Sequence, residues 1–146
     1  MISPDDPQLS NVGQMGGPAL ILYDGDCVLC SGWFRFVAQR DVARKFLFTA
    51  IQSSYGRALA IRHGIDPDNP QSNAVLIDGS VNLKSDSAIA AISNLPRYGW
   101  VQLFLLLPKR LRDPLYSMIA RNRYNWFGRN EACWLGGAKY ADRVIG

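Results

Sequence analysis

Two cysteines separated by two residues, Cys27 and Cys30, are the side chains of this sequence best suited to chemistry. In disulfide exchange the nucleophile is a thiolate, and a nearby second thiol can attack the mixed disulfide that the first one forms. At the start of a helix this spacing puts both sulfurs on nearly the same face, one turn apart. The spacing therefore predicts Cys27 as the nucleophile and Cys30 as the resolving thiol. Cys27 is expected to be the more accessible and the more acidic of the two.

The segment around the cysteines is expected to place them between a strand and a helix. An apolar run over residues 19–23 lies between a Gly-Pro pair and an Asp-Gly pair, which is typical of a buried strand. Apolar residues over 33–40 suit one face of a helix, which puts Cys27 at its N-terminus. Unpaired N–H groups and the helix dipole stabilise an anion there, so such cysteines have pKa values of roughly 3.5–7.5.

Two other interpretations of the cysteines stay open. Cysteine is among the most buried residue types, so both thiols can be inert parts of a core. A structural zinc site needs about four ligands, and only Cys133 and His63 remain to complete one, without paired spacing. We therefore expect no metal and no cofactor. His63 precedes a glycine and is expected to end a helix rather than to act in catalysis.

Asp24 and Asp26 come just before Cys27. Asp24 is expected to form the turn together with Gly25. Asp26 can cap the helix or accept the proton of the resolving thiol, and the sequence leaves both open. Asp-x-Asp after an apolar strand also resembles the first motif of haloacid-dehalogenase-like hydrolases. Asp24 would then be the nucleophile of a Mg²⁺-dependent phosphohydrolase, but the later acidic pair that holds the metal in such enzymes is not evident.

The segment 24–30, Asp-Gly-Asp-Cys-x-x-Cys, resembles the DCC family of predicted thiol-disulfide oxidoreductases, which is named for its Asp and two Cys. Other blocks of the chain are similar to that family, and the similarity covers roughly residues 19–135. These blocks are residues 48–53, 75–79, 84–88 and 121–128. The resemblance implies a thioredoxin-like fold and a redox function.

The remaining patterns predict the same fold. Apolar runs at 46–50 and 74–77 predict two more buried strands, and the Asp-Gly pair after the second predicts a hairpin to a strand at 81–84. Helices are expected over residues 55–63 and 85–95. The order β-α-β-α-β-β-α predicts an α/β protein with a thioredoxin-like mixed four-stranded sheet and flanking helices.

Thioredoxins and glutaredoxins place a cis-proline just before the third strand, and this chain has Asn73 there, with Pro70 too early. Asparagine keeps its N–H and is expected in trans, which should narrow the groove beside Cys27. Small thiols or disulfides are therefore the expected substrates, with a protein thiol as the other partner class. Ser85-Asp86 resembles the glutaredoxin segment that binds the glutathione γ-glutamyl carboxylate, although an ordinary helix cap would need the same residues.

The two ends of the chain differ in composition from the middle. Residues 1–18 are rich in Pro, Gly, Ser, Asn and Asp, which predicts a flexible tail before a single domain over 19–146. Residues 1–96 hold seven Lys/Arg and nine Asp, for −2, whereas residues 97–146 hold nine Lys/Arg and three acids, for +6. The C-terminal third is therefore the basic part of the chain.

This basic third is expected to form an extra helical extension. The apolar run at 100–107 is too short to span a membrane and should either pack on the sheet as a helix or dock on a membrane or a protein. A helix is expected over 111–121, with three apolar residues on one face. The aromatic residues within 124–127 are expected in the core.

The composition also indicates the cellular location and the class of partner. Three cysteines are too few for a secreted disulfide framework, and the acidic N-terminus is not a signal peptide, so a cytoplasmic location is expected. No nucleic-acid partner is expected, because the arginines of the basic third alternate with aromatic residues. The non-enzymatic alternative is a thioredoxin-like adaptor that binds a partner without turnover.

Overall fold

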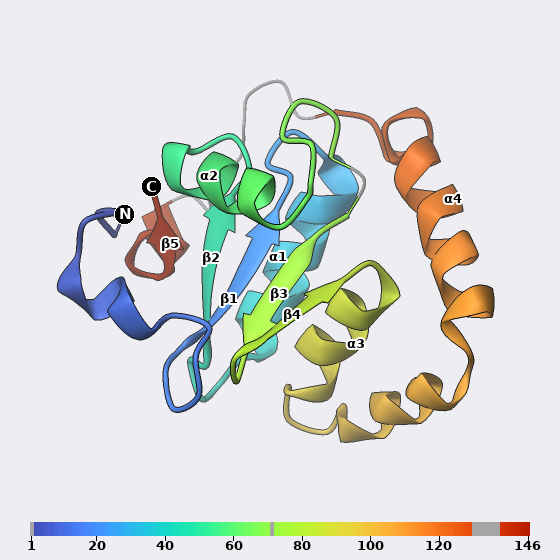
Figure 1. Ribbon diagram of the computed structural model, residues 1–146, viewed down its shortest axis with the longest axis horizontal. Helices are drawn as coiled ribbons and strands as arrows, with labels where there is room; N and C mark the ends of the chain where they lie inside the picture. The colour runs from blue at the N-terminus through green and yellow to red at the C-terminus, as the bar shows by residue number, and fades with distance from the viewer. Residues whose placement is uncertain (1, 71, 130–137) are drawn as a thin grey trace.

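The fold is described by a computed structural model over residues 2–70, 72–129 and 138–146. Its centre is a five-stranded sheet of order β4-β3-β1-β2-β5 (Figure 1). Strand β2 is parallel to β1, and β3 is antiparallel to both β1 and β4. The strands are β1 (Ala19–Tyr23), β2 (Phe46–Ala50), β3 (Ala74–Ile77), β4 (Ser80–Leu83) and β5 (Val144–Ile145). The helices are α1 (Val28–Arg40), α2 (Ser54–Arg62), α3 (Ser85–Ser93) and α4 (Lys109–Phe127), with the 3-10 helices η1 (Pro7–Asn11), η2 (Gly99–Leu106) and η3 (Ala138–Arg143).

Strand β1 is buried on both faces of the sheet, which explains why all five of its residues are apolar or aromatic. Ile21 and Tyr23 belong to a core that includes residues of α1, α3 and η3. Leu22 points to the opposite face and packs in a second core with Ala60 of α2. Helices α1 and α3 therefore cover one face of the sheet and α2 covers the other, as in a thioredoxin-like fold.

The expected strands and turns are confirmed. The hairpin between β3 and β4 has positive φ angles at Asp78 (49°) and Gly79 (79°), which a type I′ turn requires at both central residues. Helix α2 begins after Ser53, whose side chain accepts a hydrogen bond from the Gly56 N–H, and its C-cap is His63. The single histidine is thus a helix-end residue, as predicted.

The sheet has a fifth strand that the sequence analysis did not predict. Strand β5 lies parallel to β2, and the Ile2 N–H donates to the Val144 carbonyl at 2.7 Å. Residues 2–18, which were expected to form a flexible tail, contain η1 and also contact the hairpin, where the Gly79 N–H donates to the Gly13 carbonyl at 2.8 Å. Both ends of the chain therefore attach to the sheet.

Of the two roles expected for the apolar run at 100–107, packing on the sheet is not observed: η2 packs against α3, and Leu106 is 83% exposed. The expectation that the aromatic residues near the end of α4 lie in the core was wrong. Trp126 and Phe127 are also outside the core, at 56% and 47% exposure. The reason is that α4 packs along one side only, against α1 and α3, and leaves its other sides uncovered (Figure 1). Within the described part of the chain, no helix is long and apolar enough to cross a membrane.

Candidate active site

Cys27 lies where β1 has ended and α1 begins, as the sequence predicted. It is the N-cap of α1, and its sulfur accepts a hydrogen bond from the Cys30 backbone N–H at 3.3 Å. Asp26, which could have capped this helix, is therefore not its N-cap. A sulfur at a helix N-cap accepts from N–H groups that have no partner within the helix, so its anionic form is stabilised.

The two thiols have opposite pKa shifts. A hydrogen bond from the Cys30 side chain, aided by the Cys30 N–H and the charge of Arg123, lowers the pKa of Cys27 to about 7, although burial and Asp24 oppose this. The same hydrogen bond, with burial and the negative charge of Cys27, raises the pKa of Cys30 far above its usual range. At neutral pH a large fraction of Cys27 is therefore thiolate, and Cys30 is the thiol that donates to it.

Both cysteines are free thiols and both are buried. Cys27 has 0% exposure and Cys30 has 6%, so the expectation that Cys27 would be the more accessible thiol was wrong. The chain after α4 returns to this point: Arg129 forms an antiparallel bridge with Cys27, and the Val28 N–H donates to the Gly128 carbonyl at 3.4 Å. Cys133, whose role the sequence left open, lies outside the described residues.

Asp24 is buried at the centre of a polar network behind the cysteines. One carboxylate oxygen accepts from the Asp26 N–H at 3.0 Å and from the Gln52 amide at 2.7 Å. The other oxygen accepts from Arg123 at 3.2 Å and from the Tyr124 hydroxyl. Asp24 thus holds the turn, as predicted, and also fixes the end of α4 against it.

Arg123 is a functional candidate that the sequence analysis missed. It is only 5% exposed, and it donates to the Pro70 carbonyl at 2.5 Å as well as to Asp24. Its Nε has no hydrogen-bond partner among the described residues. Its charge acts to lower the pKa of both thiols. The block 121–128 was noted as family-like, but it lies more than 90 residues from the cysteines and its position could not be inferred from spacing.

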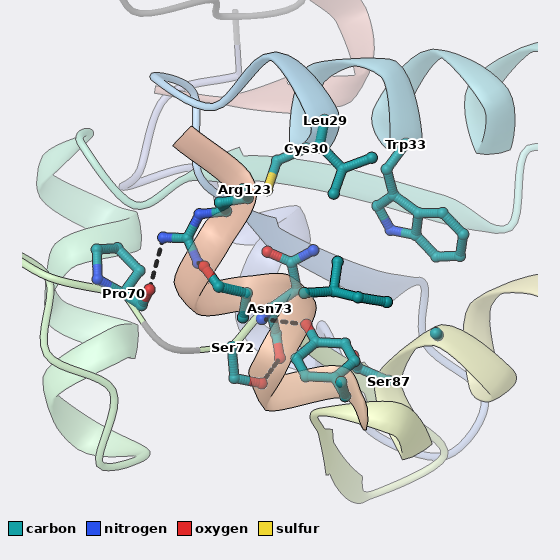
Figure 2. A pocket seen from close by; sticks show the side chains of 12 residues that line it. Leu29, Cys30, Trp33, Pro70, Ser72, Asn73, Ser87 and Arg123 are labelled. Atoms are coloured by element: carbon teal, nitrogen blue, oxygen red, sulfur yellow. Dashed lines mark hydrogen bonds between the residues drawn. The ribbon is translucent and has the colours of Figure 1, made fainter. Parts of the chain in front are cut away.

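A pocket of about 160 Å³ opens beside Cys30 (Figure 2). The Cys30 sulfur and the Trp33 ring point from α1 toward it, and Asn73 and Arg123 border it. Cys27 is not among its lining residues. The full lining is Leu29, Cys30, Trp33, Pro70, Ser72, Asn73, Ser87, Ala88, Tyr116, Ile119, Ala120 and Arg123. The surface is mainly apolar, with a thiol and a guanidinium at one side.

Asn73, in the segment before β3, lines the pocket beside Cys30, whereas the sequence had predicted a groove beside Cys27. No described residue follows a cis peptide bond, so the expectation of a trans peptide is confirmed. The Asn73 N–H donates to the Tyr116 hydroxyl of α4 at 3.1 Å. Tyr116, in the C-terminal extension, therefore accepts a hydrogen bond from a backbone N–H that a proline at position 73 would not have.

Ser85 and Asp86 are not among the residues that line this pocket. Both are in the first turn of α3, where Ser85 donates to Asp113 at 2.5 Å and Asp86 pairs with Lys109 at 2.7 Å and Arg112 at 2.8 Å. Burial acts to raise the pKa of Asp86, but its hydrogen bonds to Lys109 and Arg112 outweigh this and lower it. Ser85 and Asp86, which were predicted to contact the substrate, instead bind residues of α4 and so connect α3 to α4. Among the described residues, no group of three or more His, Cys, Asp or Glu side chains is placed to hold a metal ion.

The chain is similar to known proteins over most of its length. The chain is 40% identical over 128 residues to the uncharacterized protein YuxK of Bacillus subtilis, covering 86% of this chain and 93% of that protein. It is 36% identical over 119 residues to a chloroplastic DCC family protein of Arabidopsis thaliana, covering 80% and 69%. No solved structure matches. The family of DCC1-like thiol-disulfide oxidoreductases matches residues 21–129, which include both cysteines, Asp24 and Arg123, and the chain belongs to this family.

Proposed function

We propose that this protein exchanges thiols and disulfides of small molecules through Cys27 and Cys30. The observation that carries the proposal is the pKa of Cys27, lowered to about 7 beside a thiol that remains protonated. Strongly shifted thiol pKa values next to a pocket are typical of reactive rather than structural cysteines. The reducing environment of the cytoplasm would allow such a pair to cycle.

The reaction proceeds in two exchanges. The Cys27 thiolate attacks one sulfur of the substrate disulfide, which forms a mixed disulfide and expels the other half as a thiolate. Cys30 then transfers its proton to that leaving thiolate and attacks the Cys27 sulfur, which releases the second half as a thiolate and leaves a Cys27–Cys30 disulfide. The released thiolate takes its proton from solvent. Two electrons pass from the protein to the substrate, and a dithiol reductant restores the pair by the reverse steps.

The exposure of the two thiols bears on the first step. The pocket borders Cys30, whereas Cys27 has 0% exposure, so attack by Cys27 requires a local movement that exposes its sulfur. A second assignment of roles follows from the same observation. In it Cys30 attacks a substrate in the pocket and the Cys27 thiolate takes its proton. The acidity of Cys27 favours the first assignment, because the thiolate is the species that reacts.

The size of the pocket supports small substrates. A dry cavity of about 150 Å³ lined by apolar side chains holds a molecule of the size of benzene. The pocket beside Cys30 is of this size, at about 160 Å³, and is likewise mainly apolar. It suits one half of a small organic disulfide better than a segment of folded polypeptide.

The phosphohydrolase alternative is disfavoured by the surroundings of Asp24. Both of its carboxylate oxygens accept hydrogen bonds from other protein groups, and its exposure is 1%. A nucleophilic carboxylate needs a free oxygen that faces the substrate. The adaptor alternative predicts that the protein binds a partner without catalytic turnover, so a kinetic assay distinguishes it from the oxidoreductase.

The test is steady-state reduction of hydroxyethyl disulfide with a dithiol donor by the wild-type protein and three cysteine variants. We expect turnover by the wild type and by Cys133→Ser, none by Cys27→Ser, and arrest as a mixed disulfide in Cys30→Ser. An inactive but folded wild type would favour the adaptor. Full activity of Cys27→Ser would contradict the assignment of the nucleophile.

A further inference from the structure

The C-terminal third exposes many large apolar side chains that no other element covers. On η2, Trp100 is 59% and Leu106 83% exposed, and on α4 Leu115 is 57% and Trp126 56% exposed. We refer to the exposed apolar residues of η2 and α4 as the η2–α4 surface. Exposed apolar patches of this extent mark interaction sites on soluble domains.

The apolar residues of α4 form one stripe along the helix. With 3.6 residues per turn, Leu111, Leu115, Met118 and Trp126 fall within a narrow arc of the helix surface. Tyr116 and Arg123 lie on a different side of α4, where they line the pocket beside Cys30. The stripe is therefore not the face by which α4 packs on the domain.

The charge around the stripe is positive. Residues 97–129 contain seven Lys/Arg and one acid, and three of the seven pair with Asp86 or Asp24 elsewhere in the chain. The acid, Asp113, is half-buried and bonded to Ser85. Arg110 and Arg121 are exposed on α4 beside the stripe. An anionic partner would meet both apolar contacts and unneutralised cations on this side of the molecule.

We propose that the η2–α4 surface binds the surface of an anionic lipid bilayer. A helix with Trp and Leu on one face and arginines beside it has the composition of segments that lie in the headgroup region. The tryptophans at the two ends of the surface suit this interface, and arginine side chains can extend from it toward lipid phosphates. Helices η2 and α4 form the outer edge of the molecule, so a flat bilayer can reach them without contacting the sheet (Figure 1).

Docking in this way also brings the candidate active site near the bilayer. Ile119 lines the pocket beside Cys30 and is 36% exposed on the side of α4 that carries the stripe. The docking itself does not depend on redox activity, because none of the residues in the stripe is a thiol.

The test is flotation of the full chain with vesicles of phosphatidylcholine alone or with added phosphatidylglycerol. Leu106→Ser/Leu115→Ser removes apolar contact, and Arg110→Gln/Arg121→Gln removes charge. The matched control, Val42→Ser/Ile61→Ser, changes side chains that are 80% and 61% exposed elsewhere. We expect binding only to the anionic vesicles and a loss of about tenfold or more in the leucine variant. The arginine variant should lose about fivefold per arginine, and the control should match the wild type.

Two results would overturn the proposal. One is equal or absent binding to the two kinds of vesicle. The other is a leucine variant that floats as well as the control. Size-exclusion chromatography with light scattering identifies the competing occupant: a dimer that dissociates on Leu106→Ser, with no vesicle binding, would assign the surface to a second copy of the chain. Circular dichroism checks that each variant is folded.

Discussion

At the residue scale, the electrostatic environment of the Cys27 thiol depends on a buried ion pair between Asp24 and Arg123, which are far apart in the sequence. Arg123 acts to lower the thiol pKa and Asp24 acts to raise it, and the two side chains contact each other at 3.2 Å. Removing one member of a buried ion pair leaves the other charge without compensation. Each member therefore affects both stability and thiol acidity.

We predict that Arg123→Gln raises the pKa of Cys27 above its value of about 7. The thiolate then forms at higher pH, so alkylation at pH 7 slows several-fold, whereas the rate well above the new pKa is unchanged. The unpaired Asp24 should also lower the free energy of unfolding by about 3–5 kcal/mol. Alkylation rates across pH and chemical denaturation measure the two effects.

The control is Arg121→Gln, which removes an equal charge from an exposed position two residues away on the same helix. It should leave both the thiol pKa and the stability close to those of the wild type. An equal pKa shift in the two variants would show that net charge, rather than the position of Arg123, sets the acidity of Cys27.

Sequence reasoning found the residues close to the motif and missed those brought in by folding. Cys27, Cys30 and Asp24 could be placed because a strand, a turn and a helix follow one another within a few residues. Arg123 and Tyr116 could not, because their positions depend on how α4 returns to the domain. The bridge that Arg129 forms with Cys27 could not be placed either, because Arg129 follows α4.

At the element scale, strands and helices with a clear apolar pattern could be predicted from the sequence. A very short strand, and a helix that packs on one side only, could not. Strands β1 to β4 carry apolar runs bounded by turn residues, and α2 has clear signals at both ends. Strand β5 has only two residues, too few for any period. The aromatic residues near the end of α4 were expected inside because aromatic side chains usually are, but nothing in the sequence indicates that one side of α4 lacks a partner.

The junction between β3 and α4 gives the prediction at this scale. Asn73→Pro removes the N–H that donates to Tyr116 and should lower the free energy of unfolding by about 1–3 kcal/mol. Asn73→Ala keeps this N–H and should cost less. Reduction of insulin disulfides should stay slow in all three proteins, because α4 still covers this side of the pocket.

Chemical denaturation and an insulin-reduction assay check these outcomes. Equal stability of the proline and alanine variants would show that the hydrogen bond to Tyr116 contributes nothing. Fast insulin reduction by the wild type would show that this site accepts protein disulfides, and would contradict the preference for small substrates.

At the scale of the whole molecule, the two chain ends complete the sheet. Ile145 of β5 has 0% exposure, and it forms a bridge with Ile2 from the other terminus. The buried pair of Asp41 and Arg143, at 2.5 Å, holds the same segment. The last residues are therefore expected to contribute to global stability rather than to fray.

Ile145→Ala should lower the free energy of unfolding by about 2–5 kcal/mol, because it leaves a cavity at a fully buried position. Ile61→Ala is the matched control, since Ile61 of α2 is 61% exposed and should change stability little. Denaturant titrations of both variants provide the measurement. A cost at Ile145 no larger than that at Ile61 would show that β5 does not form in solution.

The proposed function itself is tested most directly by mapping the first covalent intermediate. A Cys30→Ser/Cys133→Ser protein keeps Cys27 as its only cysteine, with the backbone N–H and a hydroxyl in place to hydrogen-bond its sulfur. Reaction with hydroxyethyl disulfide should give a mixed disulfide at Cys27, detected by mass spectrometry, at a rate that rises with pH through an apparent pKa near 7. A Cys27→Ser/Cys133→Ser protein should react more slowly at pH 7. The variant removes the hydrogen bond to Cys27 and its charge, but burial still raises the pKa of Cys30. Faster adduct formation at Cys30, or no adduct in either protein, would contradict the account.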